Sequence, residues 1–201
     1  MTPYEIHLTV PLDPNRTDEL EWFKQVCASF NAKAIVIDAE PLVDVMSSYR
    51  MMSENQNEAV KEMTKQITIL QGIGFRVIRS KLETSLDHPA ALTPLPNQYF
   101  ESHIQVLCTD EQVGILRDLS KELQFHVSRN AFKTMQNGKH VRMATLREYH
   151  STPTVFRNLT KSVRNVLEIN GFDFHKEMEI EFALYDSNQS HDLAWLQKNQ
   201  Y

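Results

Sequence analysis

The chain has 201 residues, of which 41% are hydrophobic and 23% are charged, and its formal net charge is −5. This composition is typical of one large or two smaller folded domains and excludes a disordered chain. The apolar runs are far too short for a membrane span, and no signal peptide is recognisable. Two cysteines, Cys27 and Cys108, make no disulfide framework and favour a cytoplasmic location.

The first part of the chain, residues 1–84, is predicted to have the order β-α-β-β-α-β. A strand at 4–10, which contains EIHLTV, is followed by a helix at 18–31 and by strands at 32–38 and 46–53. A helix at 57–75 carries apolar residues at spacings of three and four, and Gly74 can adopt the left-handed conformation that ends a helix. The last strand is expected at 76–84.

Residues 85–98 contain three prolines and no periodicity, which predicts a stiff linker. The order then repeats in residues 99–184. The strand 99–108 contains ESHIQV, which matches EIHLTV, and a helix at 110–124 and strands at 125–133 and 140–148 follow. Thr152 and Pro153 are a typical N-cap and first residue for a helix at 152–172, before a strand at 173–184. Residues 185–201 form a polar C-terminal tail.

The fold class that follows is α+β, with two tandem ferredoxin-like (β-α-β-β-α-β) repeats. Each repeat should place two helices on one face of a four-stranded antiparallel sheet. The resemblance covers nearly the whole chain but is topological, and this fold carries many unrelated functions. Two arrangements stay open. The open sheet faces either face each other across a pseudo-twofold cleft or lie side by side in solvent.

Side chains alternate between the two faces of a strand. In the strand 4–10, the aliphatic residues should therefore pack under the helices, while Glu5, His7 and Thr9 lie on the open face. The matching strand places Glu101, His103 and Gln105 in the same way, and Arg79 and Lys81 join them from a neighbouring strand. In the last strand, Glu177, Glu179 and Glu181 are expected to face the same way as His103. If the sheets face each other, Glu5, His7, Glu101 and His103 line one cleft together with Arg79, Lys81, Glu177 and Glu179.

Two histidines in such a cleft are candidates for general acid and base, so His7 and His103 are the predicted catalytic residues. Arg79 and Lys81 are expected to bind an anionic group, and Thr9 and Gln105 to contact the substrate. His7-Leu8-Thr9 resembles the His-x-Thr/Ser mark of the 2H phosphoesterase superfamily, although His103-Ile104-Gln105 lacks the hydroxyl. The resemblance implies a hydrolase that acts on a small anionic, phosphoester-like substrate.

A divalent metal is a second hypothesis for the same cleft. Glu5, His7, Glu101 and His103 would provide two carboxylates and two imidazoles, and residues two apart on a strand share one face. The alternative is purely structural: Glu5 pairs with Arg79 or Lys81, and the histidines make cross-strand polar pairs.

Tandem units of this order also occur in RNA-binding proteins, which stack bases on aromatic residues of the first and third strands. The third strands here, YRMMSE and VRMATLR, lack that aromatic pattern, and the net charge is negative. Nucleic acid is therefore disfavoured as a partner. The alternative to an enzyme is a noncatalytic ligand-binding or protein-interaction module that uses the open sheet faces. The sequence does not determine the oligomeric state.

Overall fold

The structure, a computed structural model, describes residues 1–39, 42–130 and 139–192. The protein is α+β. Its strands and helices are, in chain order, β1 (Thr2–Val10), α1 (Thr17–Ser29), β2 (Lys33–Asp38), β3 (Val43–Ser53), α2 (Gln56–Gly72), β4 (Arg79–Ser85), the 3₁₀ helix η1 (Pro89–Leu92), β5 (Tyr99–Cys108), α3 (Asp110–Leu123), β6 (His126–Asn130), β7 (His140–Glu148), α4 (Pro153–Ile169), β8 (Asp173–Phe174), β9 (Glu179–Asp186) and the 3₁₀ helix η2 (Gln189–Asp192). Residues 193–201 of the predicted tail lie outside the described residues.

The ends of the long helices are set by local chemistry. Thr152 caps α4 by accepting a hydrogen bond from the Val155 amide, and Pro153 begins the helix, as predicted. Gly74 and Gly171 follow α2 and α4 with φ of 96° and 82°, a conformation that glycine adopts without strain.

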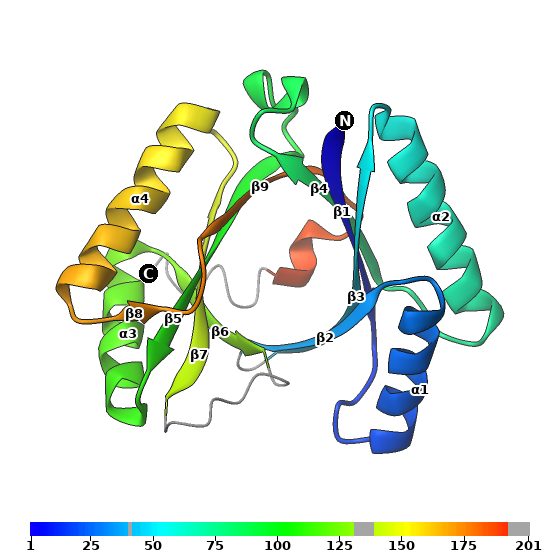
Figure 1. The fold of residues 1–201 in the computed structure, drawn as a ribbon, viewed down its shortest axis with the longest axis horizontal. Coiled ribbons are helices and arrows are strands. Elements are labelled where there is room, and N and C mark those ends of the chain that lie inside the picture. The colour runs from blue at the N-terminus through cyan, green and yellow to red at the C-terminus, as the bar shows by residue number, and fades with distance from the viewer. Residues whose placement is uncertain (40–41, 131–138, 193–201) are drawn as a thin grey trace.

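All nine strands of the described residues belong to one antiparallel sheet, in which β8 pairs only with β5. The other eight strands close into a barrel, in the order β5-β7-β6-β2-β3-β1-β4-β9-β5 (Figure 1). The prediction of two separate sheets, with open faces across a cleft, is therefore wrong. The strands that would be the edges of those sheets pair with each other, β2 with β6 and β4 with β9. The edge strand of an open sheet has unpaired backbone N–H and C=O groups. Closure of the sheet into a barrel pairs these groups and leaves no edge strand.

The hydrophobic core lies outside the barrel, between the strands and the helices. Figure 1 shows α1 and α2 on the β1–β3 side and α3 and α4 on the β5–β7 side. Ile6 and Leu8 of β1 and Ile104 and Val106 of β5 are fully buried in this core. The opposite faces of the same strands therefore point into the barrel.

Two irregularities change the register of the strand predicted at 173–184. Phe174 faces Val106 and Glu179 faces His103, so four residues lie opposite two on β5 and the strand divides into β8 and β9. A bulge between β4 and β9 then turns Tyr185, which is 42% exposed, outward.

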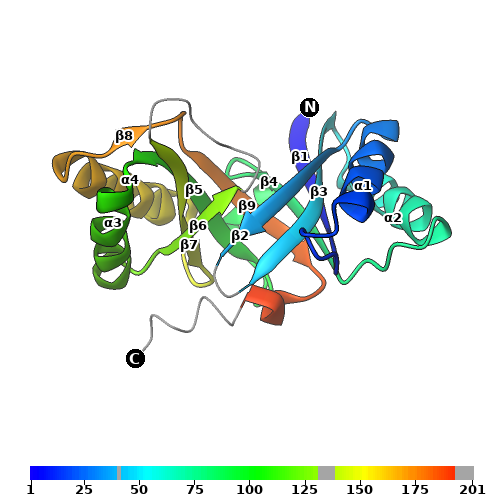
Figure 2. The same ribbon diagram turned by 90° about the horizontal axis from the view of Figure 1, so that it is seen from below.

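The short helix η2 lies across one end of the barrel, where it is seen inside the ring of strands in Figure 1 and at the lower end in Figure 2. None of the helices in the described part of the chain is long and apolar enough to cross a membrane.

Candidate functional site

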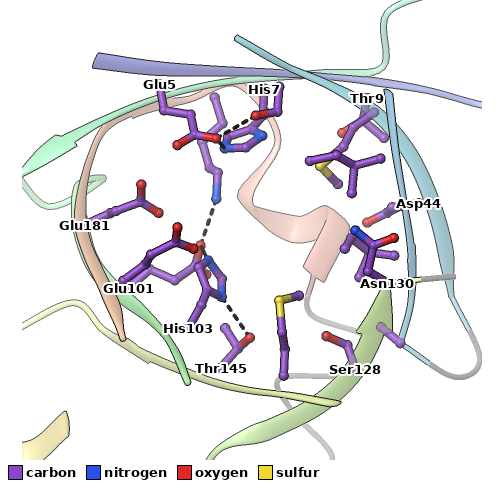
Figure 3. A pocket seen from close by; sticks show the side chains of 18 of the residues that line it. Glu5, His7, Thr9, Asp44, Glu101, His103, Ser128, Asn130, Thr145 and Glu181 are labelled. Atoms are coloured by element: carbon purple, nitrogen blue, oxygen red, sulfur yellow. Dashed lines mark hydrogen bonds and ion pairs between the residues drawn. The ribbon is translucent and has the colours of Figure 1, made fainter. Parts of the chain in front are cut away.

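The barrel encloses a cavity of about 550 Å³ (Figure 3). Of the residues that the sequence predicts for a shared cleft, Glu5, His7, Arg79, Lys81, Glu101, His103 and Glu179 lie in its wall, and so do the predicted substrate contacts Thr9 and Gln105. Glu177, which was also expected in the cleft, does not line the cavity, because it lies in the irregular segment between β8 and β9. The strands bring the lining residues together because alternation sends every second side chain into the barrel. Their placement is thus observed, while the roles proposed for them stay predictions.

The wall of the cavity has two chemical sides. Strands β2, β3 and β7 contribute the apolar residues Ile35, Ile37, Met46, Val141 and Met143. Strands β1, β4, β5 and β9 contribute most of the ionisable residues. A cavity of this kind matches a small molecule that has both a polar and an apolar part.

The cations of the cavity wall contact carboxylates. Arg79 binds Asp186 at 2.6 Å and Asp192 at 2.8 Å. Burial would lower the pKa of Arg79, but the hydrogen bond to Asp186 and the charge of Asp192 raise it. Tyr99 also donates its hydroxyl to Asp186, at 2.7 Å. The guanidinium group is therefore a fixed charge inside the barrel.

Glu101 is held by two cations. Its Oε1 lies 2.5 Å from Nη2 of Arg147, and its Oε2 lies 2.7 Å from Nζ of Lys81. Burial opposes the charge of Glu101, but Arg147 and Lys81 lower its pKa well below the usual value. Lys81 also contacts Glu83 at 2.8 Å, so Lys81 has two carboxylate partners before any ligand binds.

His7 is fixed by the carboxylates around it. Its Nε2 lies 3.0 Å from Oε2 of Glu83 and 3.5 Å from Oε1 of Glu5. Burial would raise the pKa of Glu83, but Lys81 and the hydrogen bond from His7 lower it to about 2. Nδ1 of His7 is buried and has no hydrogen-bond partner among the described residues. His7 therefore contacts a carboxylate through Nε2, while its Nδ1 is buried.

His103 is more accessible to the cavity, with 21% of its side chain exposed. Its Nδ1 lies 3.0 Å from Oγ1 of Thr145 on β7, and its Nε2 lies 3.6 Å from Oε2 of Glu101. The second distance is too long for a hydrogen bond. When Nδ1 carries the proton and donates to Thr145, Nε2 is left as a proton acceptor.

Glu181 of β9 is the unusual carboxyl group of the cavity. It faces Glu101 across the β5–β9 ladder, and Figure 3 shows its carboxyl directed into the cavity between Glu5 and Glu101. It has no hydrogen bond or ion pair with any described residue. Burial, reinforced by the charges of Glu83 and Glu5, raises its pKa well above the usual value. Burial therefore keeps the protonated form of Glu181 stable to a higher pH than is usual for a glutamate.

The four proposed metal ligands do not form a metal site. In residues 1–39, 42–130 and 139–192, no group of three or more His, Cys, Asp or Glu side chains could hold a metal ion. Glu5 instead accepts hydrogen bonds at 2.6 Å from Ser48 and from Arg50, while Glu101 binds Lys81 and Arg147. Glu5 contacts neither of the expected cations, Arg79 and Lys81. Its cationic partner is Arg50, which the sequence did not suggest.

Sequence reasoning missed two residues of this site. Arg147 had a signal, because it alternates with Thr145 along β7 and so shares the inner face. Asp192 had none, because it lies in a polar tail without periodicity. Glu181 was expected to face the same way as His103, and it lines the cavity, but its lack of a partner depends on the other strands.

Comparisons with known proteins give little beyond the fold. No family model matches the chain, and no curated protein matches it. Among solved structures, the small subunit of acetolactate synthase from Thermotoga maritima matches with 10% identity, over 92% of this chain and 96% of that chain, at a TM-score of 0.30. A mutant chlorite dismutase from Candidatus Nitrospira defluvii matches with 9% identity, over 91% and 92%, at a TM-score of 0.33. Scores this low support no argument about function.

The resemblance to the 2H phosphoesterase superfamily is wrong. The sheet is one closed barrel and not the pair of facing sheets on which that comparison depended. The second His-x-Thr/Ser motif is also missing at His103, whose hydroxyl partner Thr145 comes from another strand. A pattern of two specified positions in three was too short to identify the family.

Proposed function

We propose that the protein is an enzyme that transfers protons to and from a small carbonyl compound bound inside the barrel. The observation that supports this most is the position of the Glu181 carboxyl group, which is directed into the cavity without a hydrogen-bond partner among the described residues and has a raised pKa. A buried carboxylic acid can donate a hydrogen bond to an oxygen on which negative charge develops. The substrate oxygen would supply the acceptor that Glu181 lacks.

His103 is the proposed proton acceptor. Glu181 and His103 occupy diagonal positions of the β5–β9 ladder. The Cα atoms of such neighbours lie about 7–8 Å apart. A small substrate fits between two groups at this spacing. His103 would take a proton from the carbon next to the carbonyl, and Glu181 would give its proton to the carbonyl oxygen, which yields the enol. Return of both protons regenerates the carbonyl compound, in which the hydrogen on that carbon has exchanged with solvent.

The predicted roles of the other residues change under this proposal. His7 would position Glu83 and would not contact the substrate, because its Nε2 binds that carboxylate and its Nδ1 is enclosed. Lys81 would hold Glu83 and Glu101 in their charged form. The alternative of a protein-interaction module would use the open faces of the sheets. These faces enclose the cavity, so they offer no surface to a second protein.

The test combines a direct measurement of Glu181 with a reaction. An infrared spectrum at neutral pH should show the carbonyl band of a protonated carboxyl group in the wild type and in Glu83→Gln, but not in Glu181→Gln. Small ketones and aldehydes that raise the melting temperature should then be incubated with the protein in D₂O. We expect deuterium at the carbon next to the carbonyl, detected by NMR.

Glu181→Gln keeps the shape and hydrogen-bonding capacity of the side chain but cannot donate an acidic proton, so it is the matched variant. It should slow deuterium exchange by about 10²–10⁴-fold, the usual contribution of general acid catalysis. Exchange at the wild-type rate in this variant, or ligands that bind without any exchange, would contradict the proposal.

A further inference from the structure

Arg79 and Arg147 hold the same carboxylate at one end of the barrel. Nη1 and Nη2 of Arg79 donate to the two oxygens of Asp192, each at 2.8 Å, and Nη2 of Arg147 donates to Oδ2 at 2.5 Å. The two arginine side chains are only 6% and 2% exposed. Two buried guanidinium groups around one carboxylate have the geometry by which arginine binds small oxyanions.

Asp192 belongs to η2, and η2 is attached by polar contacts. Its sequence, Gln-Ser-His-Asp, has no apolar side chain that could anchor it in the core. Nε2 of His191 lies 2.6 Å from Oδ1 of Asp44, and Nε2 of Gln189 donates to the backbone oxygen of Asn97. Water or a dissolved ion can replace such contacts, whereas it cannot replace the burial of an apolar side chain.

Arg79 and Arg147 each contact one carboxylate besides Asp192, and Asp192 is the carboxylate that they share. Without Asp192, Arg79 would keep Asp186 and Arg147 would keep Glu101. Some buried N–H groups of both side chains would then have no acceptor, which is unfavourable. A small oxyanion in place of Asp192 would restore the same contacts and the same total charge.

We propose that Arg79 and Arg147 form a binding site for a small oxyanion, a carboxylate or a phosphate, and that Asp192 occupies this site as a displaceable part of the chain. All three residues line the cavity, and η2 covers one end of the barrel (Figure 2). Binding of the anion therefore moves η2 away and opens that end. This site is independent of the proton transfer proposed above.

The experiment uses the full chain with Asp192→Gly, which removes the carboxylate. Sodium acetate and sodium phosphate should each raise the melting temperature of this variant, compared with sodium chloride of equal ionic strength. The wild type should bind acetate at least about tenfold more weakly, because a tethered carboxylate competes at an effective concentration in the millimolar range. Arg79→Gln in the Asp192→Gly background should abolish the effect of acetate.

Two further measurements cover the case in which Asp192→Gly does not fold. Asp192→Asn keeps the shape of the side chain and should also be stabilised more by acetate than the wild type is. In the wild type, acetate should speed hydrogen exchange at the His191 amide, which donates to Asn188 within η2. Equal stabilisation of wild type and variants by acetate, or unchanged exchange at His191 in saturating acetate, would overturn the proposal.

Discussion

Two parts of the barrel wall have the same kinds of residue in the same register. In the first wall, β1 lies between β3 and β4. In the second wall, β5 lies between β7 and β9. The residues that face one another across the strands are Arg50, Glu5 and Glu83 in the first wall, and Arg147, Glu101 and Glu181 in the second. Despite this match, the pKa values of Glu83 and Glu181 shift in opposite directions: that of Glu83 is lowered to about 2, and that of Glu181 is raised well above the usual value.

The contact with Lys81 distinguishes the two carboxyl groups. Lys81 lies next to Glu83 on β4, contacts it at 2.8 Å and favours its charged form. Glu181 has no ion pair with any described residue, so burial and then the charges of Glu83 and Glu5 raise its pKa, and its neighbour Glu179 on β9 adds a smaller effect of the same sign. A contact with one cation thus separates a structural carboxylate from a candidate acid, and such a separation of pKa values is typical of acid–base pairs in active sites.

The largest effect is expected from Arg147→Met in the second wall. This change leaves Glu101 and Asp192 without a buried cation that contacts both at 2.5 Å. Removing one partner of a buried ion pair costs about 3–5 kcal/mol. Urea unfolding at neutral pH should show a loss of that size. A loss below about 1 kcal/mol would mean that the network is hydrated and not a fixed part of the interior.

A smaller loss of stability, which depends on pH, is expected from Glu83→Gln. The carboxyl has a pKa of about 2 in the folded protein against an ordinary 4.5, so stability is gained as the pH rises through this range and lost as it falls. We expect Glu83→Gln to cost about 3 kcal/mol at neutral pH and little near pH 2. Unfolding curves measured over this range would check it.

Glu181→Gln is the matched control and should behave in the opposite way. The pKa of Glu181 is raised, so above pH 4.5 the unfolded chain loses a proton that the folded protein retains. Wild-type stability should therefore fall as the pH rises from 4.5 toward the raised pKa, and Glu181→Gln should remove this fall. If both variants changed the pH profile in the same direction, the contrast between the walls would be wrong.

The smallest effect is expected from Arg50→Met, the first-wall counterpart of Arg147→Met. Arg50 contacts Glu5 at 2.6 Å and Glu179 at 3.2 Å, but its side chain is 64% exposed. Water screens such pairs, so we expect a loss of less than about 1 kcal/mol in the same urea experiment. A loss equal to that of Arg147→Met would show that exposure does not distinguish the two arginines.

The faces of β1, β4 and β5 could be predicted from the sequence because alternation is a local property. It placed Glu5, His7, Glu101 and His103 on one surface, and the structure has them there. The closure of the barrel could not be predicted, because the pairing of β2 with β6 and of β4 with β9 joins strands from different halves of the chain. Periodicity carries no information about such partners.

The charge states in the site were equally inaccessible to sequence reasoning. The pKa of Glu181 depends on burial and on Glu83 and Glu5, which come from two other strands. The inner position of Asp186 depends on a bulge that shifts the alternation of β9 after Ala183. Arg147 could have been found from alternation along β7, but its position opposite Glu101 depends on the register of β5 and β7.

The barrel is closed by two ladders of unequal length. β4 and β9 pair at five positions, but in the part of the chain that the structure describes β2 and β6 pair only at Ile37–Asn130 and Asp38–Arg129. Both ladders join distant segments, so each requires a large loss of chain entropy before it gains contacts. We expect the β2–β6 seam to form last during folding and to part first during fluctuations, which makes it the weakest point in the wall around the charged interior.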